Sequence, residues 1–215
     1  MEKNIPEVVF GSSDKSISQS ISRMVKSGKL RKLMPRVYTS NFNDPAEVIV
    51  GRNLYLILGK LFPGALLSHR TALEGRPTMD HTIFLTYKYT KKVELPGFTV
   101  RLIKGHDPTK HDMPFLDGLY ISSEPRAYLE NMQLARSRGY SPKSLPKEAI
   151  EERLNRICQI RGEEELNQLR AKAREIAGQL NLEAEFRSLN KIISALLQTS
   201  PAKVLKSPLA RARAF

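Results

Sequence analysis

The spacing of apolar residues changes twice along the chain, and this pattern constrains the fold more than any other feature. Residues 1–76 and 124–215 place apolar side chains three and four positions apart, which is typical of amphipathic helices. Between them lie three short runs rich in β-branched and aromatic residues: Thr82–Tyr87, Phe98–Ile103 and Leu119–Ile121. We therefore expect an α+β, mainly helical protein with an N-terminal domain over 1–76, a small β-rich segment over 77–123 and a helical region over 124–215.

The chain carries a net charge of +13 over 215 residues, and this surplus bears on its partners. A charge of this size favours polyanions such as DNA, RNA or an anionic membrane, with an ordinary solvated surface as the alternative. The single cysteine, Cys158, excludes an intrachain disulfide and fits a reducing cytosol. The N-terminus does not resemble a secretory signal, and no run approaches the roughly 20 apolar residues that span a bilayer. We expect a cytoplasmic protein without a membrane partner.

A basic amphipathic helix is predicted over Lys15–Ser27, followed at once by a hairpin. The apolar face of this helix consists of Ile17, Ile21, Met24 and Val25. A polar turn before Lys15 suits a helix start, and Gly28 suits its end. Two β-prone pieces then flank the basic turn Pro35–Arg36, which predicts a short hairpin ending at Val37–Thr39.

The helix and hairpin together have the composition of a DNA-reading element. No acidic residue lies between Lys15 and Arg36, and short polar side chains stand opposite the apolar face. Such a helix can present Gln, Ser and Arg to base edges, while a basic hairpin lies along phosphates. The candidate DNA-binding residues are Lys15, Ser18, Gln19, Ser20, Arg23, Lys26, Lys29, Arg31, Lys32 and Arg36.

A plainer interpretation of the same segment is a solvated amphipathic helix followed by an ordinary hairpin. A complete winged helix also needs supporting helices, and only some dozen residues precede Lys15. Either the helix expected over Pro45–Leu61 supplies this support, or the domain is abbreviated.

Two families resemble parts of this sequence. The stretch Ser18–Thr39, with its helix, Gly, basic Leu-rich strand and Arg-x-Tyr, resembles the helix and wing of AbiEi-family antitoxins, and Gly64–Glu74 is similar to the segment that follows there. The chain from about Phe10 onward also resembles the region that precedes the catalytic domain in some bacterial Fic-family proteins. The closest segments are Phe84–Lys92 and Ser207–Phe215.

The first resemblance implies a winged-helix domain over 1–76 that binds duplex DNA, regulates its own promoter and neutralises a partner toxin. The second implies the regulatory part of a Fic-type adenylyltransferase, with 124–215 leading to a separate or missing catalytic partner. A general RNA-binding protein is a third hypothesis, which the lack of aromatic residues within the basic run disfavours. The sequence favours the antitoxin-type regulator and leaves the oligomeric state open.

No catalytic constellation is found in the sequence. The Fic signature, His-Pro-Phe followed by Gly-Asn-Gly-Arg, is absent, and the inhibitory motif fails because Arg70 and Arg126 stand where a hydroxyl residue is needed. The segment Phe10–Ser13 is similar to the start of small nucleotidyltransferases, but Ser22–Met24 occupies the place of their metal-binding Asp pair. We therefore expect no enzyme.

No metal or cofactor site is expected either. The histidines do not have an established zinc spacing, although two of them share a loop with two aspartates: His69, His81, His106 and His111. Cys158 lies beside an apolar helical stripe, where a buried, inert thiol is the favoured interpretation.

The charged segment Glu148–Leu180 is predicted to form two helices that break at Gly162, and a further apolar face runs from Phe186 to Leu197. These helices form either an intramolecular bundle or a surface for a partner, and the sequence leaves both open.

Overall fold

The computed structural model describes residues 5–133 and 144–199, and it confirms the expected α+β, mainly helical class. The chain forms two compact units. The first unit comprises the chain up to Leu67 together with Arg76–Pro108 and Met113–Ile121. The second comprises Ser68–Gly75, Thr109–Asp112 and the chain from Ser122 onward.

This division differs from the three segments expected from the sequence. The N-terminal part and the β-rich part share one apolar core, in which Val37 of the hairpin, Ile57 of the following helices and Leu102 of the sheet all belong to one cluster. Apolar burial therefore unites 1–67 with most of 77–121. Periodicity reports each element alone and carries no information on which elements share a core.

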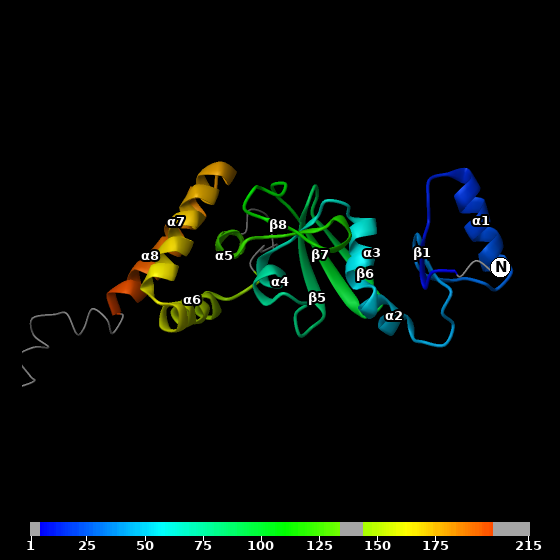
Figure 1. The fold of residues 1–215 in the computed structure, drawn as a ribbon, viewed down its shortest axis with the longest axis horizontal. Helices are drawn as coiled ribbons and strands as arrows, with labels where there is room; N and C mark the ends of the chain where they lie inside the picture. The colour runs from blue at the N-terminus through cyan, green and yellow to red at the C-terminus, as the bar shows by residue number, and fades with distance from the viewer. Residues whose placement is uncertain (1–4, 134–143, 200–215) are drawn as a thin grey trace, which may run out of the picture. The chain divides into compact units, whose positions relative to one another are not determined.

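The N-terminal elements of the first unit are a helix and a three-stranded sheet, which lie at the blue end of the ribbon in Figure 1. Strand β1 (Val8–Phe10) and strand β2 (Arg31–Met34) flank strand β3 (Val37–Thr39), and both pairings are antiparallel. Helix α1 (Lys15–Lys26) lies between β1 and β2 along the chain. The predicted helix and hairpin are confirmed, and β1 adds a third strand to the hairpin.

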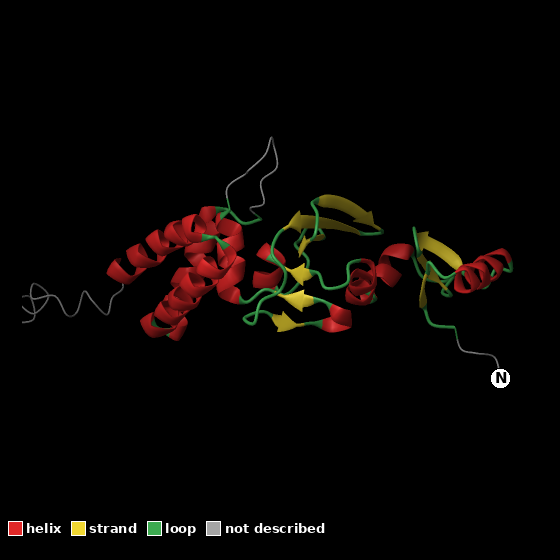
Figure 2. Cartoon of the chain, turned by 90° about the horizontal axis from the view of Figure 1, so that it is seen from above, coloured by secondary structure: helices red, strands yellow, loops and turns green. Residues whose placement is uncertain are grey.

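The rest of the first unit consists of two short helices and a six-stranded mixed sheet, drawn as yellow arrows in Figure 2. Helices α2 (Ala46–Arg52) and α3 (Leu54–Leu61) replace the single helix expected over Pro45–Leu61, because the chain breaks at Asn53. The strand order is β6-β7-β5-β4-β9-β8. The strand bounds are β4 (Leu66–Leu67), β5 (Thr82–Tyr87), β6 (Lys91–Leu95), β7 (Phe98–Lys104), β8 (Met113–Pro114) and β9 (Tyr120–Ile121), with a 3-10 turn η1 (Leu116–Gly118) before β9.

Three of these six strands, β5, β7 and β9, were expected, whereas β4, β6 and β8 were not. The pair Lys91–Lys92 was interpreted as a divider between two strands, yet it begins β6. This strand lies at one edge of the sheet, and an edge strand with exposed lysines discourages pairing with another chain. The pair therefore belongs to a strand although it lacks the usual composition of one.

The second unit is helical and contains α4 (His69–Glu74), α5 (Glu124–Met132), α6 (Lys147–Arg161), α7 (Glu163–Leu180) and α8 (Glu183–Thr199). The predicted break at Gly162 is confirmed, since this residue has φ of 91° and separates α6 from α7. Helix α5 is the central element: it packs against α4, α7 and α8, and every residue from Pro125 to Met132 is buried. The segment Ser207–Phe215, one of those that resemble the Fic-family proteins, lies outside the described residues.

Polar groups buried inside the second unit form one connected network. Arg126 on α5 donates to Asp112 over 2.5 Å and to Glu130 over 3.1 Å. The other carboxylate oxygen of Glu130 accepts from the Ser122 hydroxyl and from the backbone N–H of His69, each over 3.1 Å. The network therefore ties together the three separate stretches of chain that build this unit.

Within the described ranges, no helix is both long and apolar enough to cross a bilayer.

Candidate nucleic-acid interface

Helix α1 is defined by local signals at both ends. The Asp14 side chain caps it by accepting from the backbone N–H groups of Ser16 and Ile17, over 2.8 and 3.1 Å. The helix ends where Gly28 adopts φ of 70°, a left-handed conformation that glycine takes without strain. Basic residues in the last turn interact favourably with the helix dipole, so the sequence favours this helix even with few tertiary contacts.

Most of the surface of α1 faces solvent. Ile21 is the single buried residue of the helix, and Met24 is half-buried. The expected apolar face is thus only partly covered, since Ile17 is 49% exposed and Val25 is 36% exposed. The described helices α2 and α3 join the core cluster of the sheets, and Ile21 is not part of that cluster. Helices α2 and α3 thus share a core with the hairpin, whereas the buried residue of α1 lies outside that cluster.

The face of α1 opposite Ile21 carries the side chains with hydrogen-bonding capacity toward DNA. In a helix of 3.6 residues per turn, Gln19, Arg23 and Lys26 fall in one row on that side. All three are exposed. Lys15, Ser18 and Ser20 are exposed as well, on the flanks of this row. The helix therefore presents a continuous polar and basic ridge about three turns long.

The hairpin β2–β3 presents a basic tip. Pro35 and Arg36 form a two-residue turn between Met34 and Val37, which are paired across the hairpin. Arg36 is exposed and adopts φ of 66°, a conformation that costs a residue with a side chain about 1–2 kcal/mol. The backbone is held in place because Gly11 donates its N–H to the Arg36 carbonyl over 2.7 Å. A strained cation at an exposed tip is a feature that folding alone does not require.

Arg31 differs from the other candidates. Its guanidinium donates to the backbone carbonyls of Asn41, over 2.9 Å, and of Asp44, and its side chain is half-buried. These bonds hold the loop between β3 and α2, so Arg31 has a structural role in this conformation. This role cannot be recognised from the sequence, because both acceptors are main-chain groups. The other nine candidate residues, including Lys29 and Lys32, are exposed.

The acids closest to this element along the chain are engaged elsewhere. No Asp or Glu lies between Lys15 and Asn43, and Asp14 caps α1. Arg52 pairs with Glu7 and also with Asp44, over 2.6 Å to the latter. These hydrogen bonds from Arg52, with others from Asn41 and Asn53, lower the pKa of Glu7 from 4.5 to about 2. Glu7 and Asp44 are thus held in ion pairs with Arg52, and within the described ranges no carboxylate forms an ion pair with a cation of α1 or the hairpin.

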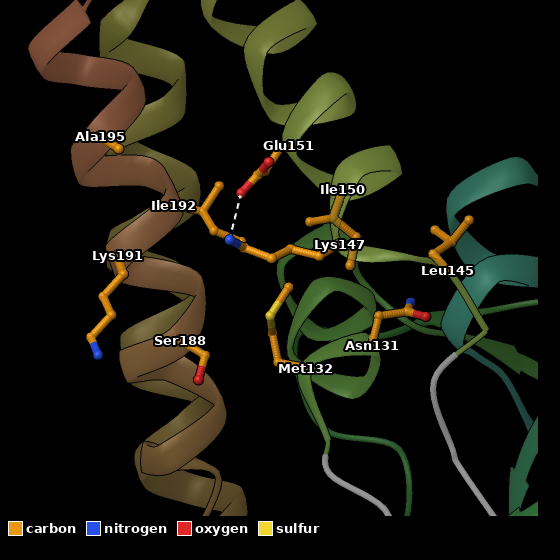
Figure 3. A pocket seen from close by; sticks show the side chains of 10 residues that line it. All are labelled: Asn131, Met132, Leu145, Lys147, Ile150, Glu151, Ser188, Lys191, Ile192 and Ala195. Carbon is orange, nitrogen blue, oxygen red and sulfur yellow. Dashed lines mark ion pairs between the residues drawn. The ribbon is translucent and has the colours of Figure 1, made fainter.

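A cavity in the second unit is lined partly by polar groups, and several of these already have partners. It has a volume of about 400 Å³ and lies between α5, α6 and α8 (Figure 3). Asn131 and Ser188 donate to carbonyls of their own helices, over 2.9 and 3.2 Å. Lys147 pairs with Glu151 over 3.1 Å, as the dashed line shows. Its floor is apolar, and we assign no function to it.

The histidines and the cysteine do not assemble into a site in the part of the chain that the structure describes. Asp112 is bound to Arg126, and His111 lies 3.2 Å from Glu175. The described residues contain no group of three or more His, Cys, Asp and Glu side chains that could hold a metal ion. Cys158 is half-buried and packs against the core of the second unit.

Comparison with known proteins adds no assignment. No protein-family model matches the sequence, and no curated protein matches it either.

Proposed function

We propose that this protein binds duplex DNA, with α1 in the major groove and the β2–β3 hairpin along the phosphate backbone. The observation that carries the proposal is the exposed ridge of α1 next to the exposed cations of the hairpin, in a segment without a single acid. DNA carries regularly spaced phosphates and presents base edges in a groove wide enough for a helix.

The chemistry of the ridge fits base reading. A Gln amide can pair with both hydrogen-bonding groups of adenine, and an Arg guanidinium can do the same with guanine. Gln19 and Arg23 lie one turn apart on the solvent side of α1, so both can point into one groove. Lys26 continues the row toward the end of the helix, where it can meet a phosphate.

The exposed cations outside this row fit phosphate binding. Lys29, Lys32 and Arg36 flank the end of α1 and the hairpin. If about five phosphates are contacted, the logarithm of affinity should fall against the logarithm of salt concentration with a slope of roughly −4 to −5.

We further propose that the DNA is the promoter of the protein's own gene and that the protein acts as an antitoxin-type regulator. This step rests on the resemblance of Ser18–Thr39 to the helix and wing of the AbiEi-family antitoxins.

The proposal is tested by fluorescence anisotropy of a labelled DNA duplex over a series of KCl concentrations. The triple variant Gln19→Ala/Arg23→Ala/Lys26→Ala removes the ridge and two charges, while alanine keeps the helix. A matched control, Arg156→Ala/Lys172→Ala, removes two exposed charges from the second unit. We expect the triple variant to lose affinity and to shallow the slope by about two units, with the control unchanged. Equal losses in both variants would mean that net charge alone is responsible.

A further inference from the structure

The connection from β5 to β6 crosses the end of β7 and brings aromatic and basic residues together there. Because β7 lies between β6 and β5 in the sheet, residues 88–90 must pass over it. The register places Tyr87 of β5 beside Lys104 of β7. The crossing segment is fixed by two hydrogen bonds, from Lys104 N–H to the Thr90 hydroxyl over 3.1 Å and from Gly105 N–H to the Tyr87 carbonyl over 3.2 Å.

Tyr89 lies in this connecting segment, and its ring packs against the ring of Tyr87, which in turn packs against Phe62. Phe62 packs edge-to-face with Tyr87 at 5.7 Å between centroids, and Tyr87 packs edge-to-face with Tyr89 at 5.2 Å. An edge-to-face contact uses at most one face of each ring, so this contact leaves at least one face of Tyr89 available. Tyr89 is 45% exposed. The row of rings therefore ends in an aromatic side chain that is held in place and open to solvent.

Three exposed lysines belong to the same part of the sheet: Lys88 and Lys91 flank Tyr89 along the chain, and Lys104 is the register partner of Tyr87. Lys91 is the register partner of Leu102, which lies two residues before Lys104, so the two lysines share one face of the sheet. Among the described residues, no carboxylate forms an ion pair with any of the three. We call Lys88, Tyr89, Lys91 and Lys104 the Tyr89 surface.

Lys92 provides a contrast within the same strand. It pairs with Glu94 over 2.6 Å, and it projects to the opposite face, where its register partner is Arg101. Protection of an edge strand would account for Lys91 and Lys92 alike. It does not account for an exposed ring, or for cations that come from the crossing segment and from β7.

We propose that the Tyr89 surface binds single-stranded nucleic acid, with the ring of Tyr89 stacked on an unpaired base and the three lysines against neighbouring phosphates. Aromatic rings between cations are the usual means by which proteins hold single strands without regard to sequence. A duplex keeps its bases stacked on one another and offers no free base to this ring. This surface is distinct from α1 and the hairpin, and the proposal does not depend on the duplex binding proposed above.

The first test is the affinity of the full-length chain for a labelled oligo-dT strand, measured by anisotropy. Tyr89→Ala should weaken binding roughly 5- to 150-fold, which is the range for loss of one stacked base, whereas Tyr89→Phe should bind like the wild type. Lys91→Ala should weaken binding and make the salt slope shallower by about 0.7, and Lys92→Ala should do neither. Circular dichroism and thermal melting check that each variant is folded.

A second measurement reports stacking directly and does not rely on loss of binding. The chain contains no tryptophan, so the Tyr89→Trp variant has a single indole at the surface. Its fluorescence should be quenched as oligo-dT is added, because a stacked base quenches the indole. A Phe42→Trp variant, which places the indole at another exposed position of the first unit, should keep its emission.

Several results would overturn the proposal. One is that Tyr89→Ala and Lys91→Ala, both folded, bind oligo-dT like the wild type. Another is that Tyr89→Phe binds as weakly as Tyr89→Ala, which would mean that the phenol hydroxyl contacts phosphate instead of the ring stacking. The triple variant of α1 separates the two proposals: it should lose affinity for the duplex and keep its affinity for oligo-dT. Loss of oligo-dT binding in this variant would place the single strand on α1 and overturn the proposal for the Tyr89 surface.

Discussion

Replacing Asp112 with alanine removes the carboxylate that faces the buried guanidinium of Arg126. The side chain of Asp112 has no exposed surface, and that of Arg126 is 1% exposed. Besides the bond from Arg126, Asp112 accepts from the backbone N–H groups of Thr109, over 2.7 Å, and Ser123, over 3.0 Å. The substitution therefore takes one carboxylate partner from a buried cation. It also leaves the backbone N–H groups of Thr109 and Ser123, and the Thr109 hydroxyl, without this acceptor.

The expected loss of stability is large for a single substitution. Breaking a buried ion pair by removing one partner costs about 3–5 kcal/mol. Because Glu130 still pairs with Arg126, we expect the lower end, about 3 kcal/mol. For a chain of this size each kcal/mol lowers the melting temperature by roughly 2–4 °C, so the expected shift is about 6–12 °C. Glu151→Ala removes the exposed partner of Lys147 and should cost no more than about 1 kcal/mol.

The assay is thermal and urea unfolding followed by far-ultraviolet circular dichroism, which reports mainly the helical second unit. Asp112→Asn retains an oxygen acceptor without the charge and should fall between the wild type and Asp112→Ala. A difference of about 2 °C corresponds to roughly 1 kcal/mol or less. If the melting temperature of Asp112→Ala lies within this difference of the wild-type value, the network does not hold the three stretches together and our reasoning is wrong.

Two further predictions concern the first unit. The pKa of Glu7 is lowered to about 2, so its bonds to Arg52 stabilise the fold above pH 4.5 and are lost as the pH falls toward 2. The free energy of unfolding is measured in urea at pH 5 and at pH 3. Between these two values, Glu7→Gln should lose less stability than the wild type. An equal loss in both would refute this. Arg36→Gly relieves the left-handed backbone strain at the hairpin tip, so the free energy of unfolding should stay unchanged or rise by up to about 1 kcal/mol. The same substitution removes one charge and should make the salt slope for duplex DNA shallower by about 0.9. Wild-type DNA binding by a folded Arg36→Gly protein would place Arg36 outside the interface.

Local signals in the sequence were sufficient for much of the secondary structure. Asp14 and Gly28 fix the two ends of α1, and Gly162 fixes the break between α6 and α7. These helix ends and this break depend on residues only a few positions apart in the chain, so they can be recognised in a single sequence. The edge strand β6 was missed because solvent exposure on an edge permits lysines, which removes the alternation on which strand prediction relies.

Contacts between residues far apart in the chain determine the features that could not be predicted from the sequence. Arg31 looked like one more phosphate ligand, but carbonyls of the β3–α2 loop engage it. The position of Tyr89 cannot be recognised from the sequence, because the rings that support it, Phe62 and Tyr87, come from different elements. Main-chain acceptors and ring contacts between distant elements leave no periodic trace in a sequence.

Whether α1 reads the bases of duplex DNA is tested by a comparison of binding specificity. Duplexes are selected from a random library with the wild-type protein, and affinities for the selected site and a scrambled site are then measured. Gln19→Ala and Arg23→Ala should weaken binding to the selected site by about 5- to 150-fold, corresponding to 1–3 kcal/mol per lost base pairing, with a smaller loss on the scrambled site. Arg36→Ala should weaken both sites equally. If the selection returns no preferred sequence, or if the α1 variants weaken both sites alike, α1 does not read bases.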